Sequence, residues 1–297
     1  MLFRAVMFLA LPAALAGAQT NEGRTEVFNG QVPGGSWLRV RTMKGDVQVK
    51  EATGRDVIVT ATRRYRMRQT GEITFEVKRD GANVTVCAIW ERTRRCDEDG
   101  YSSRSNSGRG WNSNEGDADF IVEIPRGVNL VAATGNGQVS VRGVGGDLEA
   151  TSGNGEVTVD GASGSVLAAS GNGDIRVDHA GGPVKAHSGN GGIRVSTTKG
   201  PVEANTGNGR IDVDMASLAG GGDMDFNTGN GSIVVTAPAN LSANIESNVP
   251  YNNFNTDFAF EIPAHWNSRR IQGTIGGGGR RIRFNTGNGR VTLRKHD

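Results

Sequence analysis

Charged side chains recur one repeat apart in the middle of the chain, and their types could act chemically on a polysaccharide. Asp174, Arg176, Arg194, Arg210 and Asp212 lie at alternate positions of strand-like segments, which places them on one outward face. Glycoside hydrolases act through paired carboxylates, so a polysaccharide lyase or hydrolase is one hypothesis for this face. Alternating charges also keep an exposed sheet soluble, and we favour that interpretation, in which the protein is not an enzyme.

A column of acidic residues could bind a cation. Asp160 and Asp178 lie one repeat apart, and Ser196 and Asp214 continue the column. Stacked carboxylates repel one another unless a cation or an Arg lies between them. The Asp that calcium-binding nonapeptide rolls require is missing from the equivalent positions, so we expect solvated surface, no metal and no cofactor.

Basic side chains gather before residue 70 and offer a weak candidate binding surface. Arg63, Arg64, Arg66 and Arg68 alternate in part, as on one face of a strand, and Trp111 is an isolated aromatic residue in a polar segment. The formal net charge is only +2, which gives no general attraction to nucleic acid. The partner is unknown from sequence; an envelope polysaccharide or another surface protein is the interpretation that we favour.

These side chains are positioned by a repeat that dominates the chain. A Ser/Thr-Gly-Asn-Gly phrase returns at a constant interval in its first five copies and at longer intervals afterwards. It begins at Thr134, Ser152, Ser170, Ser188, Thr206, Thr228 and Thr286. Apolar pairs such as Val157/Val159 and Val166/Ala168 recur at half the constant interval and alternate with polar residues, which indicates strands with one buried face. Each repeat therefore contains two units of a strand and a turn.

A fixed period of this kind predicts a stacked-repeat fold. A left-handed hexapeptide helix would repeat every six residues, and an antiparallel meander would not need alternate turns to be nearly identical. Right-handed connections between parallel strands are the strong default. We therefore predict an all-β, right-handed parallel β-solenoid with 18-residue coils of two strands each.

The turn asparagines have a structural explanation. Gly and Asn accept the positive φ of tight turns, and identical Asn side chains in register form amide ladders. A ligand-binding edge is the less favoured alternative. The predicted turn residues are Asn136, Asn154, Asn172, Asn190, Asn208, Asn230 and Asn288.

Residues 1–18 have the features of a signal peptide. Arg4 precedes an apolar run, and Ala16-Gly17-Ala18 forms a small-residue cleavage site. The apolar run is too short to cross a bilayer, and no later segment is apolar enough to anchor the mature chain. We expect an exported protein, in the periplasm, outside the cell or at its surface.

The mature chain divides into three parts. Residues 19–96 predict irregular β coils and a hairpin, and Cys87 and Cys96 predict a disulfide, since an exported protein with one cysteine pair usually oxidises it. Residues 97–118 are polar without an apolar period and predict a flexible loop. Residues 119–297 predict the regular solenoid, with an insertion at about 237–275.

The repeated Ser/Thr-Gly-Asn-Gly phrase, the stretch VEIPRGVNLVAATGNG and the closing GTIGGGGRRIRFNTGNGRVTLRK resemble the DUF4097 family of bacterial proteins. The resemblance covers roughly residues 27–294. It implies a β-helical exported protein with an adhesin-like role, and it supplies no catalytic residues. The combined prediction is a non-catalytic envelope or surface module that binds or scaffolds, with the lyase or hydrolase as the alternative.

Overall fold

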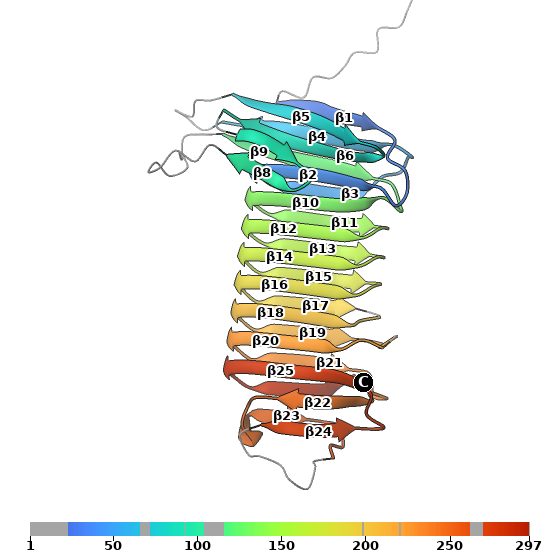
Figure 1. Ribbon diagram of the computed structural model, residues 1–297, viewed down its shortest axis with the longest axis vertical. Coiled ribbons are helices and arrows are strands. Elements are labelled where there is room, and N and C mark those ends of the chain that lie inside the picture. Colours follow the sequence, from blue (N-terminus) through green and yellow to red (C-terminus); the bar gives the residue numbers. More distant parts are fainter. Residues whose placement is uncertain are drawn as a thin grey trace, which may run out of the picture.

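Two twelve-stranded β-sheets run along an elongated molecule and enclose one apolar core (Figure 1). The computed structural model describes residues 23–65, 72–91, 93–103, 116–197, 199–219, 221–261 and 270–296. Sheet A has the strand order β1-β4-β9-β3-β11-β13-β15-β17-β19-β21-β26-β23, and sheet B has the order β24-β22-β25-β20-β18-β16-β14-β12-β10-β2-β6-β5. The predicted signal peptide lies outside the described residues.

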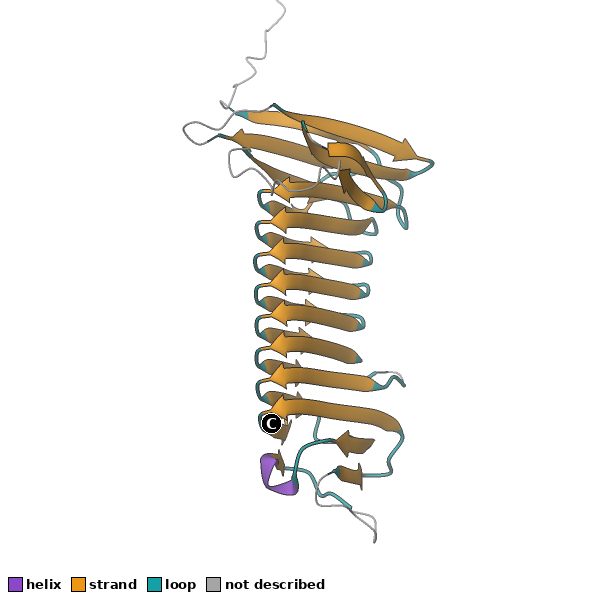
Figure 2. Cartoon of the chain, turned by 60° about the vertical axis from the view of Figure 1, so that its left-hand side comes forward, coloured by secondary structure: helices purple, strands orange, loops and turns teal. Residues whose placement is uncertain are grey.

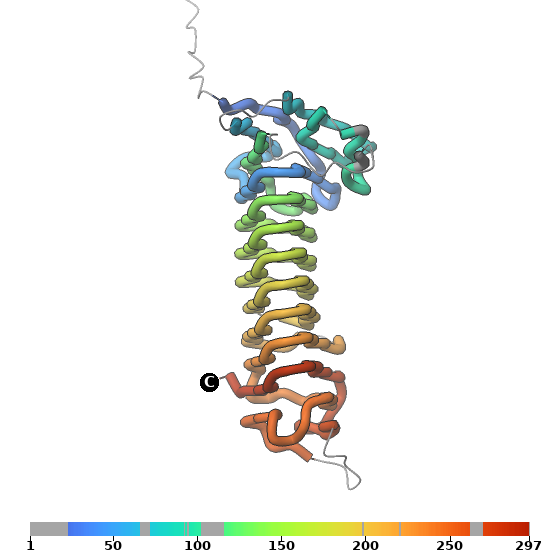
Figure 3. Tube along the Cα trace, turned by 90° about the vertical axis from the view of Figure 1, so that its left-hand side faces the viewer, coloured from blue at the N-terminus to red at the C-terminus, as the bar shows by residue number. Residues whose placement is uncertain are grey.

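The regular coils each place one strand in each sheet (Figures 2 and 3). Neighbouring coils pair in parallel and in register, so that Leu130 lies beside Leu148 and Asn136 beside Asn154. The predicted all-β parallel solenoid with two strands per coil is confirmed. In sheet B the strands are β10 (Asn129–Asn136), β12 (Leu148–Asn154), β14 (Val166–Asn172), β16 (Val184–Asn190), β18 (Val202–Asn208), β20 (Met224–Asn230) and β25 (Arg280–Asn288); in sheet A they are β11 (Val139–Val144), β13 (Val157–Ala162), β15 (Ile175–Ala180), β17 (Ile193–Thr197), β19 (Ile211–Met215), β21 (Ile233–Ala237) and β26 (Val291–Lys295).

The core between the sheets follows the predicted alternation. Val and Ile side chains of sheet A face Val, Leu and the smaller Ala of sheet B, and all of these inward positions are buried. In later coils Phe226 and Phe284 take the place of Ala, and their rings stack with centroids 5.5 Å apart. The outward positions between them are left for polar side chains.

The first strands differ from the expected series of degenerate coils. Only β2 (Trp37–Lys44) and β3 (Val47–Glu51) form a parallel coil beside β10 and β11. Strand β4 (Val57–Arg64) instead lies antiparallel between β1 (Arg24–Gly30) and β9 (Asp117–Ile124). The predicted hairpin is present as β5 (Ile73–Asp80) and β6 (Asn83–Trp90), and β6 pairs in parallel with β2.

Two further segments depart from plain coils. Strands β7 (Thr93–Asp97) and β8 (Gly100–Ser103) form an antiparallel hairpin, so residues 100–103 of the expected loop are a strand. Near the C-terminus the insertion contains β22 (Ala243–Ser247), the 3-10 turn η1 (Tyr251–Asn253), β23 (Phe254–Thr256) and β24 (Ile271–Ile275). Strand β22 pairs with β25 and β24, and β23 pairs with β26, so the insertion covers the end of both sheets.

None of the described residues forms a helix that is long and apolar enough to cross a bilayer.

Candidate functional site

The seven predicted turn asparagines form one continuous row, here called the edge ladder. Each Asn lies in register with the Asn of the next coil and is exposed. The Nδ2 of each donates to the Oδ1 of the Asn in the preceding coil, at 2.7 to 2.9 Å. The side chains therefore tie the coils together along one edge of the solenoid.

The glycines of these turns are required by contact between coils. A Cβ at Gly173 would lie 2.3 Å from the carbonyl oxygen of Gly155, and a Cβ at Gly155 would lie 2.0 Å from that of Gly137. Among the non-glycine residues that the structure describes, only His179 has a positive φ, of 54°. The turn asparagines therefore do not adopt the positive φ expected for them.

A second row of polar side chains lies on the outward face of sheet B, three residues before the edge ladder. We call His187, Asn205, Asn227 and Asn285 the inner ladder. Asn227 Nδ2 donates to Asn205 Oδ1 and Asn285 Nδ2 donates to Asn227 Oδ1, both at 2.6 Å. Asn205 Nδ2 lies 3.2 Å from His187 Nδ1. Since the amide nitrogen can only donate, Nδ1 accepts and His187 carries its proton on Nε2.

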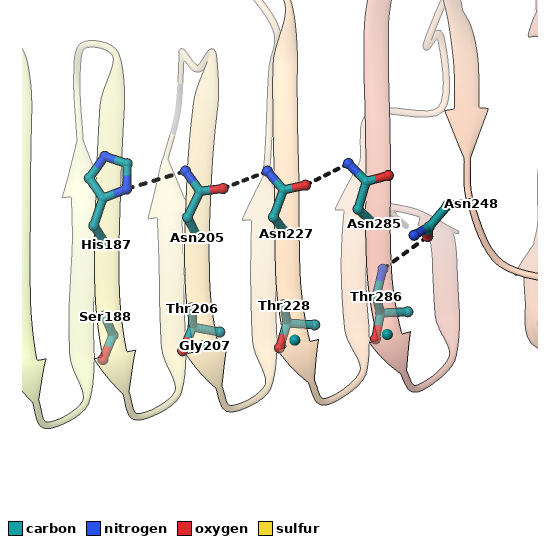
Figure 4. A pocket seen from close by; sticks show the side chains of 12 residues that line it. His187, Ser188, Asn205, Thr206, Gly207, Asn227, Thr228, Asn248, Asn285 and Thr286 are labelled. Atoms are coloured by element: carbon teal, nitrogen blue, oxygen red, sulfur yellow. Dashed lines mark hydrogen bonds between the residues drawn. The ribbon is translucent and has the colours of Figure 1, made fainter.

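The inner ladder borders a hollow of about 420 Å³ (Figure 4). The hollow spans β16, β18, β20 and β25, which are successive strands of sheet B. Its lining contains no Asp, Glu, Lys or Arg and consists of His187, Ser188, Asn205, Thr206, Gly207, Asn227, Thr228, Gly229, Asn248, Asn285, Thr286 and Gly287. It is a shallow groove that crosses the coils and is bordered by the amides of the inner ladder.

The hydroxyl groups of this groove are already fixed. Thr206 Oγ1 donates to the carbonyl oxygen of Gly191 and Thr228 Oγ1 donates to that of Gly209, both at 2.9 Å. These hydroxyl side chains are buried, whereas Gly207 and Gly229 beside them are exposed. The glycines leave an open strip of backbone between the inner ladder and the edge ladder, so a ligand can approach without meeting side chains.

A smaller hollow of about 340 Å³ continues the groove toward the C-terminal insertion. It shares Asn248 and Asn285 with the first hollow and adds charged side chains, among them Glu246 and Arg283. Arg283 donates to Glu246 Oε2 at 3.3 Å through both Nε and Nη2. The charge in this continuation is therefore largely paired.

The charged face expected on sheet A does come together. Asp174, Arg176, Arg194, Arg210 and Asp212 line a hollow of about 280 Å³, with Glu156 as a sixth titratable group that the sequence analysis missed. Asp212 Oδ2 lies 3.3 Å from Arg210 and 3.9 Å from Arg194, and Asp174 Oδ1 accepts the backbone N–H of Gly192 at 2.7 Å. These two carboxylates are thus held by donors within the site.

The aspartates of the proposed acidic column have basic partners. Asp178 Oδ2 pairs with Arg176 at 2.5 Å, and Asp160 Oδ1 lies 2.8 Å from Nδ1 of the exposed His179. The hydrogen bond and the charge of Asp160 raise the pKa of His179. No group of three or more His, Cys, Asp or Glu in the described part of the chain is placed to hold a metal.

Two of the four basic candidate residues before residue 70 make contacts within the fold. Arg63 donates to the carbonyl oxygen of Ile73 at 2.6 Å, and its guanidinium lies 4.6 Å from the ring centroid of Phe75. Arg64 is hydrogen-bonded to Asp119, which raises the pKa of Arg64. Arg66, Arg68 and Trp111 lie outside the described residues.

The cysteine pair fastens the β7–β8 hairpin to sheet B. A disulfide joins Cys87 on β6 to Cys96 on β7, with their Cα atoms 6.3 Å apart. The Tyr101 hydroxyl on β8 lies 2.6 Å from the carbonyl oxygen of Arg41 and 2.8 Å from that of Ala88. Burial raises the pKa of Tyr101, so the hydroxyl stays protonated and donates to these carbonyls.

The fold thus defines a parallel two-sheet solenoid of repeated coils with polar hollows on its outer faces. The chain belongs to the Toastrack DUF4097 family, whose model matches residues 36–294. No curated protein matches the sequence.

Among the solved structures that are similar to the chain, three are compared as follows. A proposed cell adhesion protein from Clostridium sporogenes is 9% identical, with 90% of this chain and 94% of the other covered and a TM-score of 0.24. A proposed adhesin from Bacteroides fragilis is 12% identical, with 92% and 97% covered and a TM-score of 0.35. A proposed lipid-binding protein from Parabacteroides distasonis is 11% identical, with 93% and 98% covered and a TM-score of 0.33. TM-scores this low do not establish a shared function.

Proposed function

We propose that the protein is a non-catalytic binding module that holds a hydroxyl-rich polymer, such as an envelope polysaccharide, against the outer face of sheet B. The observation that carries this proposal is the groove of about 420 Å³ along the inner ladder. Amides and backbone groups fixed by the fold can hydrogen-bond sugar hydroxyls without rearranging, which lowers the cost of binding.

An exported location agrees with this role. The N-terminal sequence has the features of a signal peptide, with Ala16-Gly17-Ala18 as the cleavage site. The disulfide between Cys87 and Cys96 fits an oxidising compartment such as the periplasm or the cell exterior. We therefore place the module in the cell envelope, where polysaccharides are abundant.

The test is binding of the purified protein to an array of envelope and extracellular polysaccharides, with released sugar ends measured on the same samples. Saturable binding without new sugar ends is the expected result. Absence of binding to every polysaccharide would refute the proposal, and cleavage would refute its non-catalytic part.

The second candidate function is a polysaccharide lyase or hydrolase, and the hollow on sheet A is the specific observation in its favour. Six titratable side chains converge there, including Asp174 and Asp212. If cleavage is observed, Asp174→Asn and Asp212→Asn should abolish it. Asp160→Asn, outside that hollow, is the matched control.

A further inference from the structure

The two middle asparagines of the inner ladder, Asn205 and Asn227, have little left to offer a ligand except carbonyl oxygens. Both N–H groups of Asn227 are used, one by Asn205 Oδ1 at 2.6 Å and one by Asp225 Oδ1 at 2.7 Å. Both N–H groups of Asn205 are likewise used, by His187 Nδ1 and by Glu203 Oε1 at 3.1 Å. An amide oxygen has two lone pairs, and each of these two oxygens accepts one bond from the next Asn. Each therefore keeps one free lone pair, so the middle of the row accepts hydrogen bonds.

The acidic side chains beside this row are paired with basic ones. Glu203 and Asp225 accept hydrogen bonds from Asn205 and Asn227. Glu203 also lies 3.5 Å from Lys185, and Asp225 lies 3.8 Å from Arg283, so these charges are balanced. A carboxylate, sulfate or phosphate on the ligand would bring only acceptors to the acceptor oxygens of Asn205 and Asn227. Hydroxyl groups bring the donors that these two amides lack, so this part of the groove favours an uncharged polymer.

The spacing of the row indicates a periodic ligand. Asn205, Asn227 and Asn285 are register partners on successive strands, so the same group recurs at the coil spacing of about 4.8 Å. That spacing is comparable with the length of one pyranose unit in an extended chain. From His187 to Asn285 the row covers four strands, or about 14 Å between the outer two.

From these three observations we infer that the groove binds an uncharged linear glycan lying parallel to the solenoid axis, one sugar unit per coil. Sugar hydroxyls donate to the free lone pairs of Asn205 and Asn227, and the open strip at Gly207 and Gly229 receives the sugar ring. This inference rests on the proposed function and adds to it the charge, the direction and the repeat length of the ligand.

The test compares two asparagines of the same coil by calorimetry. Asn227→Ala removes a member of the inner ladder, whereas Asn230→Ala removes a member of the edge ladder that does not line the groove. The probes are neutral linear oligomers of glucose, mannose and N-acetylglucosamine, each as a length series, and oligogalacturonate as the anionic counterpart. Thermal unfolding of both variants checks that each still folds.

We expect affinity for a neutral oligomer to rise with length until the chain covers the four coils and then to level off. Asn227→Ala should weaken that binding roughly three- to tenfold, the effect of losing a typical hydrogen bond, and Asn230→Ala should leave it unchanged. Equal losses in the two variants would overturn the placement, and a preference for oligogalacturonate would overturn the uncharged class. Either result would leave the proposed function standing, provided the polysaccharide array still shows binding.

Discussion

Replacing Gly173 by Ala separates two explanations for the turn glycines. Gly173 and Gly155 occupy equivalent positions in neighbouring coils, but only Gly155 has a clearly positive φ, of 149°. A Cβ at either position would lie within 2.3 Å of a backbone carbonyl oxygen in the preceding coil. If contact between coils is the reason for glycine, both substitutions should be equally damaging.

The loss of stability in Gly173→Ala can be estimated from the contact between its Cβ and the Gly155 carbonyl oxygen. Ordinary contact between carbon and oxygen needs about 3.5 Å, so the coils at Gly173 would have to separate by about 1 Å. That separation would strain the backbone bond from Gly155 N to Asn172 O, which is 3.0 Å long. Overpacking costs about 1 to 3 kcal/mol, and the closest atoms belong to the Gly155 backbone, which cannot rotate away as a side chain can. We expect a loss of about 3 kcal/mol, which corresponds to a fall in Tm of roughly 5 to 10 °C.

Thermal unfolding followed by circular dichroism measures this loss. Gly54→Ala is the matched control, because a Cβ there has nothing within 4 Å, and we expect a change in Tm close to zero. If Gly173→Ala is tolerated while Gly155→Ala unfolds the protein, positive φ and not close approach explains these glycines, and the reasoning is wrong.

Two further predictions concern the head and one turn of the solenoid. Replacing Cys87 and Cys96 together by Ala should lower the free energy of unfolding by about 2 to 3 kcal/mol, because the disulfide closes a short loop. Amide hydrogen exchange should become faster in β7 and β8 and stay slow in β14. An equal increase in β14 would contradict a local role of the disulfide. Asp160→Asn should lower the pKa of His179 toward its ordinary value of about 6.5, as read by NMR titration. Because Asp160 raises the pKa of His179, any stability from this pair is present at pH below about 6.5 and is lost as the pH rises through the raised pKa. A His179 pKa that is the same in Asp160→Asn would refute the pairing.

The regular part of the fold could be predicted from the sequence because the repeat specifies register. Side chains alternate between the faces of a strand, so a slip of one residue would expose Val157 and Val159 and bury Thr158. Identical turns then place Asn on Asn, as the edge ladder shows. The repeat period and the alternation of apolar and polar residues were sufficient to predict the regular coils from Asn129 onward.

The N-terminal part could not be predicted in the same way, because alternation carries no information on strand direction. Val57, Val59 and Ala61 alternate with polar residues in β4 whether the neighbouring strand is parallel or antiparallel. The sequence between β4 and β9 contains no repeated turn that would indicate the direction of the next strand. The structure has β4 antiparallel to β9, with its apolar face still buried.

The groove was missed although its signal is in the sequence. The longer phrase Asn-Thr-Gly-Asn-Gly begins at Asn205, Asn227 and Asn285. The repeat phrase Ser/Thr-Gly-Asn-Gly starts one residue later, so it does not include these asparagines. Asn248, which also lines the groove, comes from the insertion and matches no repeat. The charged hollow on sheet A was easier to predict, because Asp174 through Asp212 fall on one face by alternation alone.

The difference between the two ladders indicates which of them the fold requires. The edge position is Asn in all seven turns, as expected of a residue that joins every coil to the next. The inner position is Ala133 in the first of these coils and Ala169 in the third, and both coils keep the same parallel register. Since the fold accepts Ala at this position, coil stacking does not explain Asn205, Asn227 and Asn285. Their amides occur together in successive coils beside a groove, which is the arrangement that recognition of an extended ligand needs.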